Sequence, residues 1–320
     1  MAVYKMGSKG DEVGKIQNRL KALEFYLGPV DGIFGGGTYA AVKAFQTSKG
    51  LDVDGVVGPE TWKALFRTKI QESALSRSSL DHRCLALTGA FETGKGFPDC
   101  FAGLSGDFDG QGMSFGVLQW NVGQDSLQPL LKDMLSQQPE TMKSIFHEQL
   151  GILLAALKSS KEELMGFVRS IQHPMKHYLY DPWRGMFKTL GRTEEFQEIQ
   201  TNYAQSLYQA AQSLCKEYAL WSERAVALMF DIKVQNGSIN KLVKAQILAG
   251  FAQLSQTLSD EDREVEKMKI VANRRAESAN PQWVEDVRER KLCIAGGEGT
   301  VHGISYDLGE QFGIGLEKRV

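Results

Sequence analysis

The stretch Asp31-Gly-Ile-Phe-Gly-Gly-Gly-Thr38 decides the fold of the N-terminal part, because it recurs as Asp54-Gly-Val-Val-Gly-Pro-Glu-Thr61. In each copy the Asp-Gly pair predicts a tight turn, and we expect the second glycine to take a positive φ. The threonine that ends each copy is expected to cap the following helix. Apolar residues recur at helical spacing around both turns, at Val13, Ile16, Leu20 and Leu23, at Ala41, Val42, Ala44 and Phe45, and at Trp62, Leu65 and Phe66. The pattern predicts three helices related by an approximate twofold axis.

A longer pattern runs through residues 1–68. It comprises Gly10-x-x-Val13-x-x-Ile16-Gln17-x-x-Leu20, Ala41-Val-x-x-Phe-Gln46, Gly50-Leu-x-x-Asp-Gly-Val-Val-Gly58 and Thr61-Trp62. The pattern resembles the helical peptidoglycan-binding domain found at the ends of bacterial and phage cell-wall hydrolases. The resemblance implies a domain that has no catalytic residues and that holds an enzyme on its polymer, which raises the local substrate concentration. The candidates for direct contact with the wall are Asp31, Tyr39 and Gln46.

Length and composition indicate a globular chain with two domains. The 320 residues are 42% hydrophobic and include 37 Lys+Arg against 39 Asp+Glu. A chain of this length can bury two cores. The near-neutral balance gives no overall basic surface, so no nucleic-acid partner is expected. No apolar run approaches the length of a membrane span, so no membrane insertion is expected either. Nothing in the sequence suggests an obligate oligomer, and we expect a monomer.

The N-terminus and the cysteines indicate where the chain is found. Residues 1–10 lack the apolar core of a signal peptide, so we expect the chain to stay in the cytosol in which it is made until a pore releases it. The four cysteines form no C-x-x-C pair, and we expect buried thiols. A Cys84–Cys100 bridge is the alternative. The other two cysteines are Cys215 and Cys293.

The composition becomes serine-rich and polar between Thr68 and about Asp81, which is typical of a linker. We therefore expect a small three-helix domain at residues 1–68, a linker at 69–80 and a larger domain at 81–320. Helical periodicity in the larger domain predicts a mainly α fold. It extends over residues 139–170, 193–230, 238–258 and 261–278.

The larger domain begins with a glutamate and an aspartate in unlike surroundings. Glu92-Thr-Gly94 ends an apolar helical stripe, and the glycine predicts the helix stop. We expect Glu92 to be half withdrawn from water, which favours the protonated form that donates to a leaving oxygen. Downstream, Asp109-Gly-Gln-Gly-Met-Ser-Phe-Gly-Val-Leu-Gln-Trp-Asn121 sets an aspartate in a glycine-rich turn. Cleavage of a glycosidic bond requires such a pair of carboxyl groups.

Two other motifs overlap this turn. Asp107-Phe-Asp-Gly-Gln-Gly112 resembles half of an EF-hand loop, but Leu118 stands where the bidentate glutamate belongs, so no metal is expected. Gly112-Met-Ser114-Phe-Gly116 matches the nucleophile elbow of esterases, with His302 as the histidine partner. No apolar strand precedes the serine, so this motif is disfavoured. Further along, His173 and His177 lack a third metal ligand, and a solvated or capping pair is expected.

Glu92-Thr-Gly and Asp109-Gly-x-Gly-x-Ser114-x-Gly116 resemble the active-site region of family 46 glycoside hydrolases, the chitosanases, within the lysozyme-like superfamily. The resemblance implies Glu92 as general acid and Asp109 as general base, with Ser114 in the place of a threonine that helps to position the attacking water. Asp107 is the alternative base. Phe230–Gly237 resembles a chitosanase helix that ends near the substrate cleft. The candidates for substrate binding are Asp107, Gln119, Trp120, Asn121, Asp231 and Gln235.

Together the two resemblances imply a modular phage endolysin without a cofactor. Its expected partner is bacterial peptidoglycan, in which it would cut the β-1,4 bond between N-acetylmuramic acid and N-acetylglucosamine. It would wait in the host cytoplasm for a holin-type pore. Three alternatives remain open. These are a lytic transglycosylase that uses Glu92 alone, a chitosanase, and a non-catalytic wall-binding protein of a phage or cell envelope.

Overall fold

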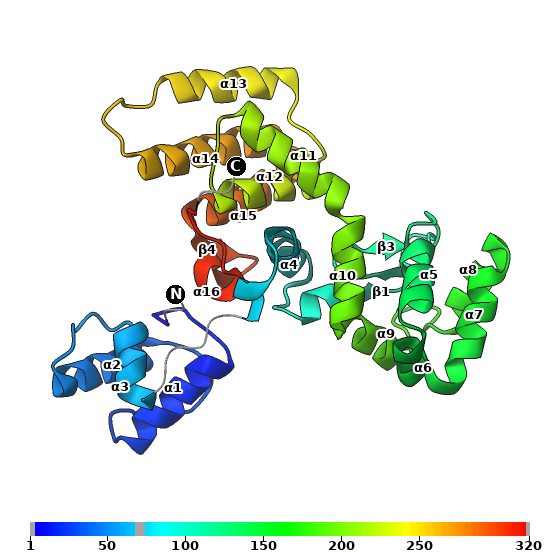
Figure 1. The fold of residues 1–320 in the computed structure, drawn as a ribbon, viewed down its shortest axis with the longest axis horizontal. Coiled ribbons are helices and arrows are strands. Elements are labelled where there is room, and N and C mark those ends of the chain that lie inside the picture. The colour runs from blue at the N-terminus through cyan, green and yellow to red at the C-terminus, as the bar shows by residue number, and fades with distance from the viewer. Residues whose placement is uncertain (1–3, 68–73, 318–320) are drawn as a thin grey trace. The chain divides into compact units, whose positions relative to one another are not determined.

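The computed structural model describes residues 4–67 and 74–317, which are mainly helical (Figure 1). This confirms the predicted fold class. The chain forms two compact units. The first comprises Met1–Arg83, Leu214–Met229 and Ser238–Val320, and the second comprises Cys84–Ser213 and Phe230–Gly237.

The N-terminal domain has the three predicted helices, α1 (Asp11–Ala22), α2 (Gly36–Lys49) and α3 (Pro59–Phe66). They enclose a small core in which every apolar side chain comes from the predicted helical stripes or from the turns between them. Its fully buried members include Val13, Ile16, Leu20, Phe34, Val42, Phe45 and Leu65. The amphipathic pattern therefore predicted this core correctly.

A buried glutamine holds the first copy of the repeat. Gln17 Nε2 donates to Asp31 Oδ1 at 2.8 Å, to the carbonyl of Ile33 at 2.9 Å and to Thr38 Oγ1 at 3.1 Å. Because the three acceptors lie in one turn, a single amide fixes the path of the chain from α1 to α2. Burial away from water makes each of these hydrogen bonds costly to lose.

The second copy has an equivalent glutamine. Gln46 Nε2 donates to Asp54 Oδ1 at 2.7 Å, to the carbonyl of Val56 at 2.9 Å and to Thr61 Oγ1 at 3.1 Å. Its Oε1 accepts from the nitrogen of Gly55 at 2.8 Å. The same contacts at matching positions confirm the internal repeat.

Two details of the repeat differ from the prediction. The glycines with positive φ are Gly32, at 68°, and Gly55, at 76°, which directly follow the aspartates. Gly35 and Gly58 have φ of −92° and −83° and occupy the N-cap positions of α2 and α3. The threonines therefore lie inside the first helical turns, and their hydroxyls accept from the buried glutamines instead of capping the helices.

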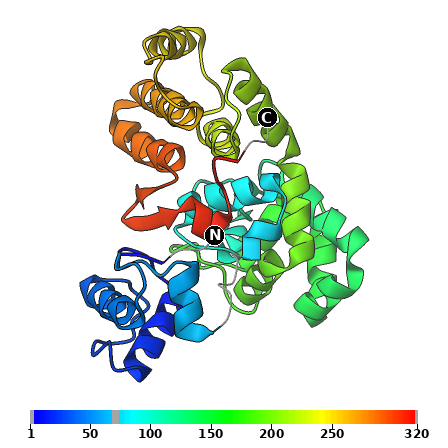
Figure 2. The same cartoon turned by 60° about the vertical axis from the view of Figure 1, so that its left-hand side comes forward.

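The rest of the first unit is a layer of helices with a short hairpin. Helices α13 (Lys241–Ala252), α14 (Asp260–Glu277) and α15 (Val284–Gly296) lie side by side in chain order (Figures 1 and 2). The antiparallel strands β4 (Glu298–Val301) and β5 (Ile304–Asp307) follow them and lead to α16 (Leu308–Phe312). Two 3₁₀ turns also lie in this unit, η1 (Ala74–Arg77) and η4 (Pro281–Trp283).

The second unit has most of the helices in the middle of the chain. They are α5 (Leu127–Gln137), α6 (Pro139–Phe146), α7 (Leu150–Lys158), α8 (Lys161–Ser170), α9 (Trp183–Arg192) and α10 (Glu194–Tyr203). The 3₁₀ turn η2 (Asp99–Ala102) precedes this series, and η3 (His147–Gln149) lies between α6 and α7. Helices α4 (Leu80–Thr93), α11 (Gln205–Glu217) and α12 (Glu223–Asn236) each have residues in both units. Helices occupy all four segments that were predicted as helical.

A small sheet lies in the second unit. Its antiparallel strands are β1 (Leu104–Ser105), β2 (Ser114–Phe115) and β3 (Trp120–Asn121), in that order. Helix α4 packs closely on it, because a Cβ on Gly89 would lie 2.1 Å from Val117 Cγ2, in the turn between β2 and β3. Only glycine leaves room for this approach.

The cysteines and the membrane prediction can be compared with the fold directly. All four cysteines are buried thiols. Burial raises the pKa of Cys100 and of Cys215 to about 12, so neither thiol ionises at neutral pH. Within residues 4–67 and 74–317, no helix is both long and apolar enough to cross a membrane. The predicted linker falls partly on residues 69–73, outside the described residues, and the domain boundaries stay predictions.

Candidate active site

The side chains of the sheet lie on its two faces. Ser114 pairs with Ser105 on β1 and with Asn121 on β3, so these three side chains lie on one face. Asn121 Nδ2 donates to Ser114 Oγ at 2.9 Å, and Asn121 Oδ1 accepts from the nitrogen of Gly123 at 2.8 Å. Asn121 is 6% exposed. The prediction that it binds sugar is therefore wrong, because its amide is buried and orients Ser114 instead.

The side chains on the other face of the sheet are apolar. Phe115 pairs with Leu104 and with Trp120, and the Phe115 ring stacks on Phe196 in the core with 5.4 Å between ring centroids. Trp120 is half-buried and packs against this core. The predicted role of Trp120 in a sugar subsite is not supported, because the register places its indole on the face opposite Ser114.

The end of α4 lies against the same sheet. A Cβ on Gly103 would lie 3.2 Å from Thr93 Cγ2 and 2.8 Å from Gln119 Nε2, so both side chains pack on this glycine. Gln119 is held at both ends of its amide, because Nε2 donates to the carbonyl of Gly116 at 2.8 Å and Oε1 accepts from Ser105 Oγ at 2.7 Å. The packing brings the last turn of α4 to the turn between β2 and β3.

Glu92 lies on this last turn of α4. The helix ends at Thr93, and Gly94 follows with a φ of 65°, which confirms the predicted helix stop. The Glu92 side chain is exposed, so the expected partial burial is wrong. The apolar residues just before Glu92 on α4 are buried in the core, and Glu92 is the first exposed residue after them.

The two aspartates of the loop between β1 and β2 have different roles. Asp107 is 9% exposed, its Oδ1 accepts from the nitrogen of Gly112 at 2.8 Å, and its own nitrogen donates to Gln172 Oε1 at 2.9 Å. Asp109 is exposed, and its Oδ1 accepts from the nitrogen of Gln111 at 3.1 Å. Asp107 therefore holds the loop together, and Asp109 presents a carboxylate to solvent.

Two buried glutamines near the sheet were missed from the sequence. Gln172 is the partner of Asp107, and Gln200 on α10 accepts from the nitrogen of Val117 at 2.8 Å and donates to the carbonyl of Phe101 at 3.2 Å. Both satisfy backbone groups of the loops that form the site. Each stands among polar residues in the sequence, so neither gave a signal of burial.

The helix α12 has the last two candidates of the second unit. Asp231 is fully buried, and its Oδ1 accepts from Thr88 Oγ1 on α4 at 3.3 Å. Direct contact between Asp231 and substrate was a wrong prediction, because no part of this side chain reaches the surface. Gln235 is half-buried, and its role stays a prediction.

The candidates of the N-terminal domain differ in exposure. Gln46 is 1% exposed and its amide is fully used inside the repeat, so its predicted contact with the wall is wrong. Tyr39 is half-buried and covers Gly55, where a Cβ would lie 2.1 Å from Tyr39 Cε2. Lys43 Nζ lies 5.6 Å from the centroid of the Tyr39 ring.

Asp31 is exposed and lines an open groove of about 710 Å³, together with Lys9, Lys15, Asn18 and Ile33. The hydrogen bond from Gln17, followed by one from the nitrogen of Ile33, lowers the pKa of Asp31 below its usual value. Asp31 is therefore a carboxylate at neutral pH, placed where a ligand could meet it.

The alternative motifs find no support in the geometry. Ser114 lies on a two-residue strand and is followed by a turn into β3, whereas a nucleophile elbow leads into a helix. His302 contacts Asp286. His173 Nδ1 accepts from the nitrogens of residues 175 and 176, each at 3.1 Å, which confirms the expected capping role for His173, whereas the ring of His177 packs on Phe108. In the part of the chain that the structure describes, no group of three His, Cys, Asp or Glu residues is arranged to hold a metal.

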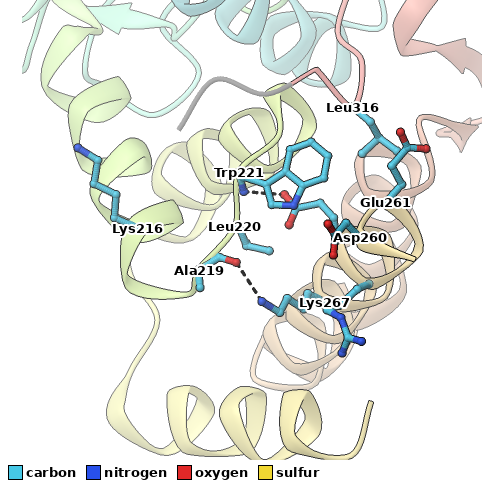
Figure 3. Close-up of a pocket in the computed structure, with 10 residues that line it drawn as sticks. Lys216, Ala219, Leu220, Trp221, Asp260, Glu261, Lys267 and Leu316 are labelled. Carbon is cyan, nitrogen blue, oxygen red and sulfur yellow. Dashed lines mark hydrogen bonds between the residues drawn. The ribbon is translucent and has the colours of Figure 1, made fainter. Parts of the chain in front are cut away.

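A further hollow, of about 850 Å³, lies in the first unit between the turn that joins α11 to α12 and the first half of α14 (Figure 3). Trp221 donates from its backbone nitrogen to Glu264 Oε1 at 2.8 Å, and Lys267 Nζ donates to the carbonyl of Ala219 at 3.0 Å. The residues that line it include none of the predicted catalytic or binding residues.

Comparison with known proteins identifies the N-terminal domain. Residues 9–65 match the family model described as "Putative peptidoglycan binding domain". The N-terminal domain belongs to this family of peptidoglycan-binding domains. A spore cortex-lytic enzyme of Bacillus cereus is 40% identical to this chain over 82 residues, which is 25% of this chain and 32% of that enzyme. The N-acetylmuramoyl-L-alanine amidase CwlM of Mycobacterium tuberculosis is 47% identical over 57 residues, 18% of this chain and 14% of the amidase.

The matched segments thus span a third or less of these two relatives. Among solved structures, a chitosanase complex is similar over a longer part of the chain. It covers 71% of this chain and 95% of the chitosanase, with 14% identity and a TM-score of 0.42. Outside the peptidoglycan-binding domain, the residues of the second unit are the basis for assigning a function.

Proposed function

We propose that this chain is a peptidoglycan hydrolase that cleaves the glycan strand. The peptidoglycan-binding domain would hold the chain on the wall, and the second unit would carry out the reaction. The names of the two relatives, a cortex-lytic enzyme and a muramoyl-alanine amidase, support peptidoglycan as the substrate. The proposal rests on two exposed acidic residues: Glu92, on the last turn of α4, whose neighbour Thr93 packs on Gly103, and Asp109, in the loop between β1 and β2.

Each carboxyl group has a role in this reaction. Glu92 would donate a proton to the leaving glycosidic oxygen, and Asp109 would remove a proton from the attacking water. Ser114 would orient that water. Because Ser114 Oγ accepts from Asn121, its own hydrogen can be donated to the water oxygen. Asp109 is the better base of the two loop aspartates, because Asp107 is buried and its Oδ1 accepts a hydrogen bond from the nitrogen of Gly112.

The bond that we propose is the β-1,4 link between N-acetylmuramic acid and N-acetylglucosamine. A transglycosylase that uses Glu92 alone is the main alternative, and Asp109→Asn distinguishes the two. Loss of activity in this variant is expected for hydrolysis, whereas a transglycosylase retains most of it. A chitosanase would release reducing ends from chitosan and none from cell walls.

We also propose a role in lysis from inside the cell, as in a phage endolysin that depends on a holin-type pore. The test is expression of the chain in a bacterial host with and without a pore-forming protein. Lysis only in the presence of the pore supports this role. Growth without lysis in both cultures contradicts it and favours an enzyme that acts on walls by another route.

Release of reducing ends from purified peptidoglycan tests the enzymatic proposal. Wild type, Glu92→Gln and the control Glu140→Gln are compared, because Glu140 is an exposed glutamate in the first turn of α6, outside the site. Activity in wild type and the control but not in Glu92→Gln is the expected result. Equal activity in all three proteins overturns the assignment of Glu92. No release of reducing ends or of anhydro-muropeptides by any of them, with binding to the wall intact, favours a non-catalytic wall-binding protein.

A further inference from the structure

Exposed aromatic side chains gather beside the loop that has Asp109. Phe108, the residue before Asp109, is 68% exposed. Tyr178 and Tyr180 are 45% and 40% exposed, and they lie in the segment between α8 and α9. Large apolar side chains are seldom left in water next to each other unless they meet a ligand or a partner. These rings take no part in the two-carboxylate reaction proposed above.

One ring contact joins the two segments, and further ring contacts lie within the second segment. The Phe108 ring lies 5.0 Å from the His177 ring, centroid to centroid. The next residue, Tyr178, lies 5.1 Å from His173 and 5.8 Å from Tyr180. We refer to Phe108, His177, Tyr178 and Tyr180 as the aromatic platform. Its members form two ring pairs, Phe108 with His177 and Tyr178 with Tyr180, on two segments that contact each other.

Hydrogen bonds hold the platform segment in place. The nitrogen of His173 donates to the carbonyl of Tyr178 at 2.9 Å, and the nitrogen of Tyr180 donates to the carbonyl of Ile171 at 2.9 Å. Gln172 joins this segment to the loop through the nitrogen of Asp107. The rings therefore have a fixed backbone beneath them, and a ligand would not need to order it.

The backbones of the loop and the platform segment also touch. A Cβ on Gly106 would lie 1.7 Å from the carbonyl oxygen of His177, so only glycine permits this contact. The buried Gln172 and Gly106 thus hold the platform segment beside the loop of Asp109. Because both contacts are between the two segments, the platform and the carboxylate keep a fixed relation to each other.

We propose that the aromatic platform binds the pyranose rings of the glycan strand next to the site of cleavage. A pyranose in the β-linked strand has a flat face of C–H groups, which packs on aromatic rings, and a rim of hydroxyl groups. The phenol groups of Tyr178 and Tyr180 can hydrogen-bond to that rim while the ring carbons pack on the sugar. The carboxylate of Asp109 follows Phe108 directly, so a sugar on Phe108 adjoins the proposed base. This inference rests on the proposed function, because it names a subsite for that substrate.

The glycan is the occupant that the surroundings favour. The platform adjoins a polar loop with an exposed carboxylate and is only partly apolar, as protein–carbohydrate surfaces need to be. A protein partner is the other class of occupant, and equal glycan affinity of the parent and all platform variants would favour it. Loss of one stacked ring is expected to weaken glycan binding about tenfold, which corresponds to about 1.4 kcal/mol.

Binding is measured by calorimetry with the full chain that has Glu92→Gln, so that the ligand is not consumed. The probe is a soluble hexasaccharide of alternating N-acetylglucosamine and N-acetylmuramic acid. Phe108→Ala, Tyr178→Ala and Tyr180→Ala are added singly to this parent. Trp283→Ala is the matched control, because Trp283 is 55% exposed in η4, which belongs to the other unit. Phe108→Tyr, which keeps a ring, tests whether stacking is the reason for any loss.

The expected result is a Kd raised about tenfold by each alanine variant, with parent affinity for Trp283→Ala and for Phe108→Tyr, and with unchanged melting temperatures. Equal affinity of the parent and all platform variants overturns the platform and leaves the proposed function intact. No binding by the parent, in a chain whose wild type cleaves purified peptidoglycan, also overturns the platform alone. A chain that neither binds the hexasaccharide nor cleaves the wall overturns both proposals.

Discussion

Gln172 Oε1 accepts a hydrogen bond from the backbone nitrogen of Asp107 at 2.9 Å, across 65 positions of sequence. Gln172 is 4% exposed, so water does not replace this bond when it is lost. The same loop has an internal bond between Asp107 Oδ1 and the nitrogen of Gly112. The exposed Asp109 thus lies in a loop that is held in place by a glutamine distant in the sequence. We regard Gln172 as a positioning residue for Asp109.

The first prediction concerns this positioning. Gln172→Ala leaves the buried N–H of Asp107 without its acceptor, which should lower the free energy of unfolding by about 1–3 kcal/mol. Cleavage of the wall should fall about tenfold, because a displaced base loses its alignment with the water. Denaturant unfolding and release of reducing ends measure the two effects. Gln137→Ala, at an exposed position at the end of α5, is the control. Equal stability of both variants would contradict a role for the hydrogen bond.

The second prediction concerns the hydroxyl of Ser114. Ser114→Ala should reduce kcat about ten- to a hundredfold and leave KM nearly unchanged, because the proposed contact is to the water and not to the sugar. Ser114→Thr keeps the hydroxyl and should retain most of the activity. Kinetics on a soluble glycan separate kcat from KM. A raised KM at constant kcat would instead show that Ser114 binds substrate.

The third prediction separates stability from binding in the peptidoglycan-binding domain. Gln46→Leu removes a buried amide that makes four hydrogen bonds, so the domain should lose about 3 kcal/mol or more. Retention on the wall should fall with the folded fraction, while cleavage of soluble glycan persists. Thr47→Ala, at the next and exposed position of α2, should change neither property. A variant that is fully folded but does not bind the wall would restore Gln46 as a contact residue.

The fourth prediction concerns acid. Folding lowers the pKa of Asp31, mainly through the hydrogen bond from Gln17, so the folded state holds this proton less tightly than the unfolded state does. The resulting stabilisation is present above the unfolded pKa, near 3.8, and is lost as the pH falls through the lower folded value. Hydrogen exchange of residues 9–65 between pH 5 and pH 2 should show a steeper loss of protection in wild type than in Asp31→Asn. Asp52→Asn, at an exposed aspartate of the same domain, should resemble wild type.

The sequence predicted those features that depend on local pattern. The three N-terminal helices follow from apolar spacing, and the end of α4 follows from Gly94. What it did not predict depends on contacts between distant segments. Asp231 and Asn121 looked like surface polar groups, but Thr88 and Ser114 take up their hydrogen bonds inside the fold. The sheet register, which turns Trp120 towards the core, is likewise a consequence of tertiary pairing.

For the repeat, one prediction is confirmed and another was wrong. The sequence showed that the two turns of the repeat are equivalent, and the contacts of Gln17 and Gln46 confirm this. The conformations of its glycines were assigned in the wrong order, because a Gly-rich turn offers several positions for a positive φ. In each copy, the glycine that takes the positive φ is the one whose nitrogen donates a hydrogen bond to the buried glutamine.

Mass spectrometry of the soluble fragments released from purified peptidoglycan tests the central claim most directly. Wild type should release muropeptides with reducing ends, and Glu92→Gln should release none at equal wall binding. Asp109→Asn should be as inactive as Glu92→Gln. Anhydro-muropeptides from wild type, or reducing muropeptides from either variant at the wild-type rate, would contradict hydrolysis by the Glu92 and Asp109 pair.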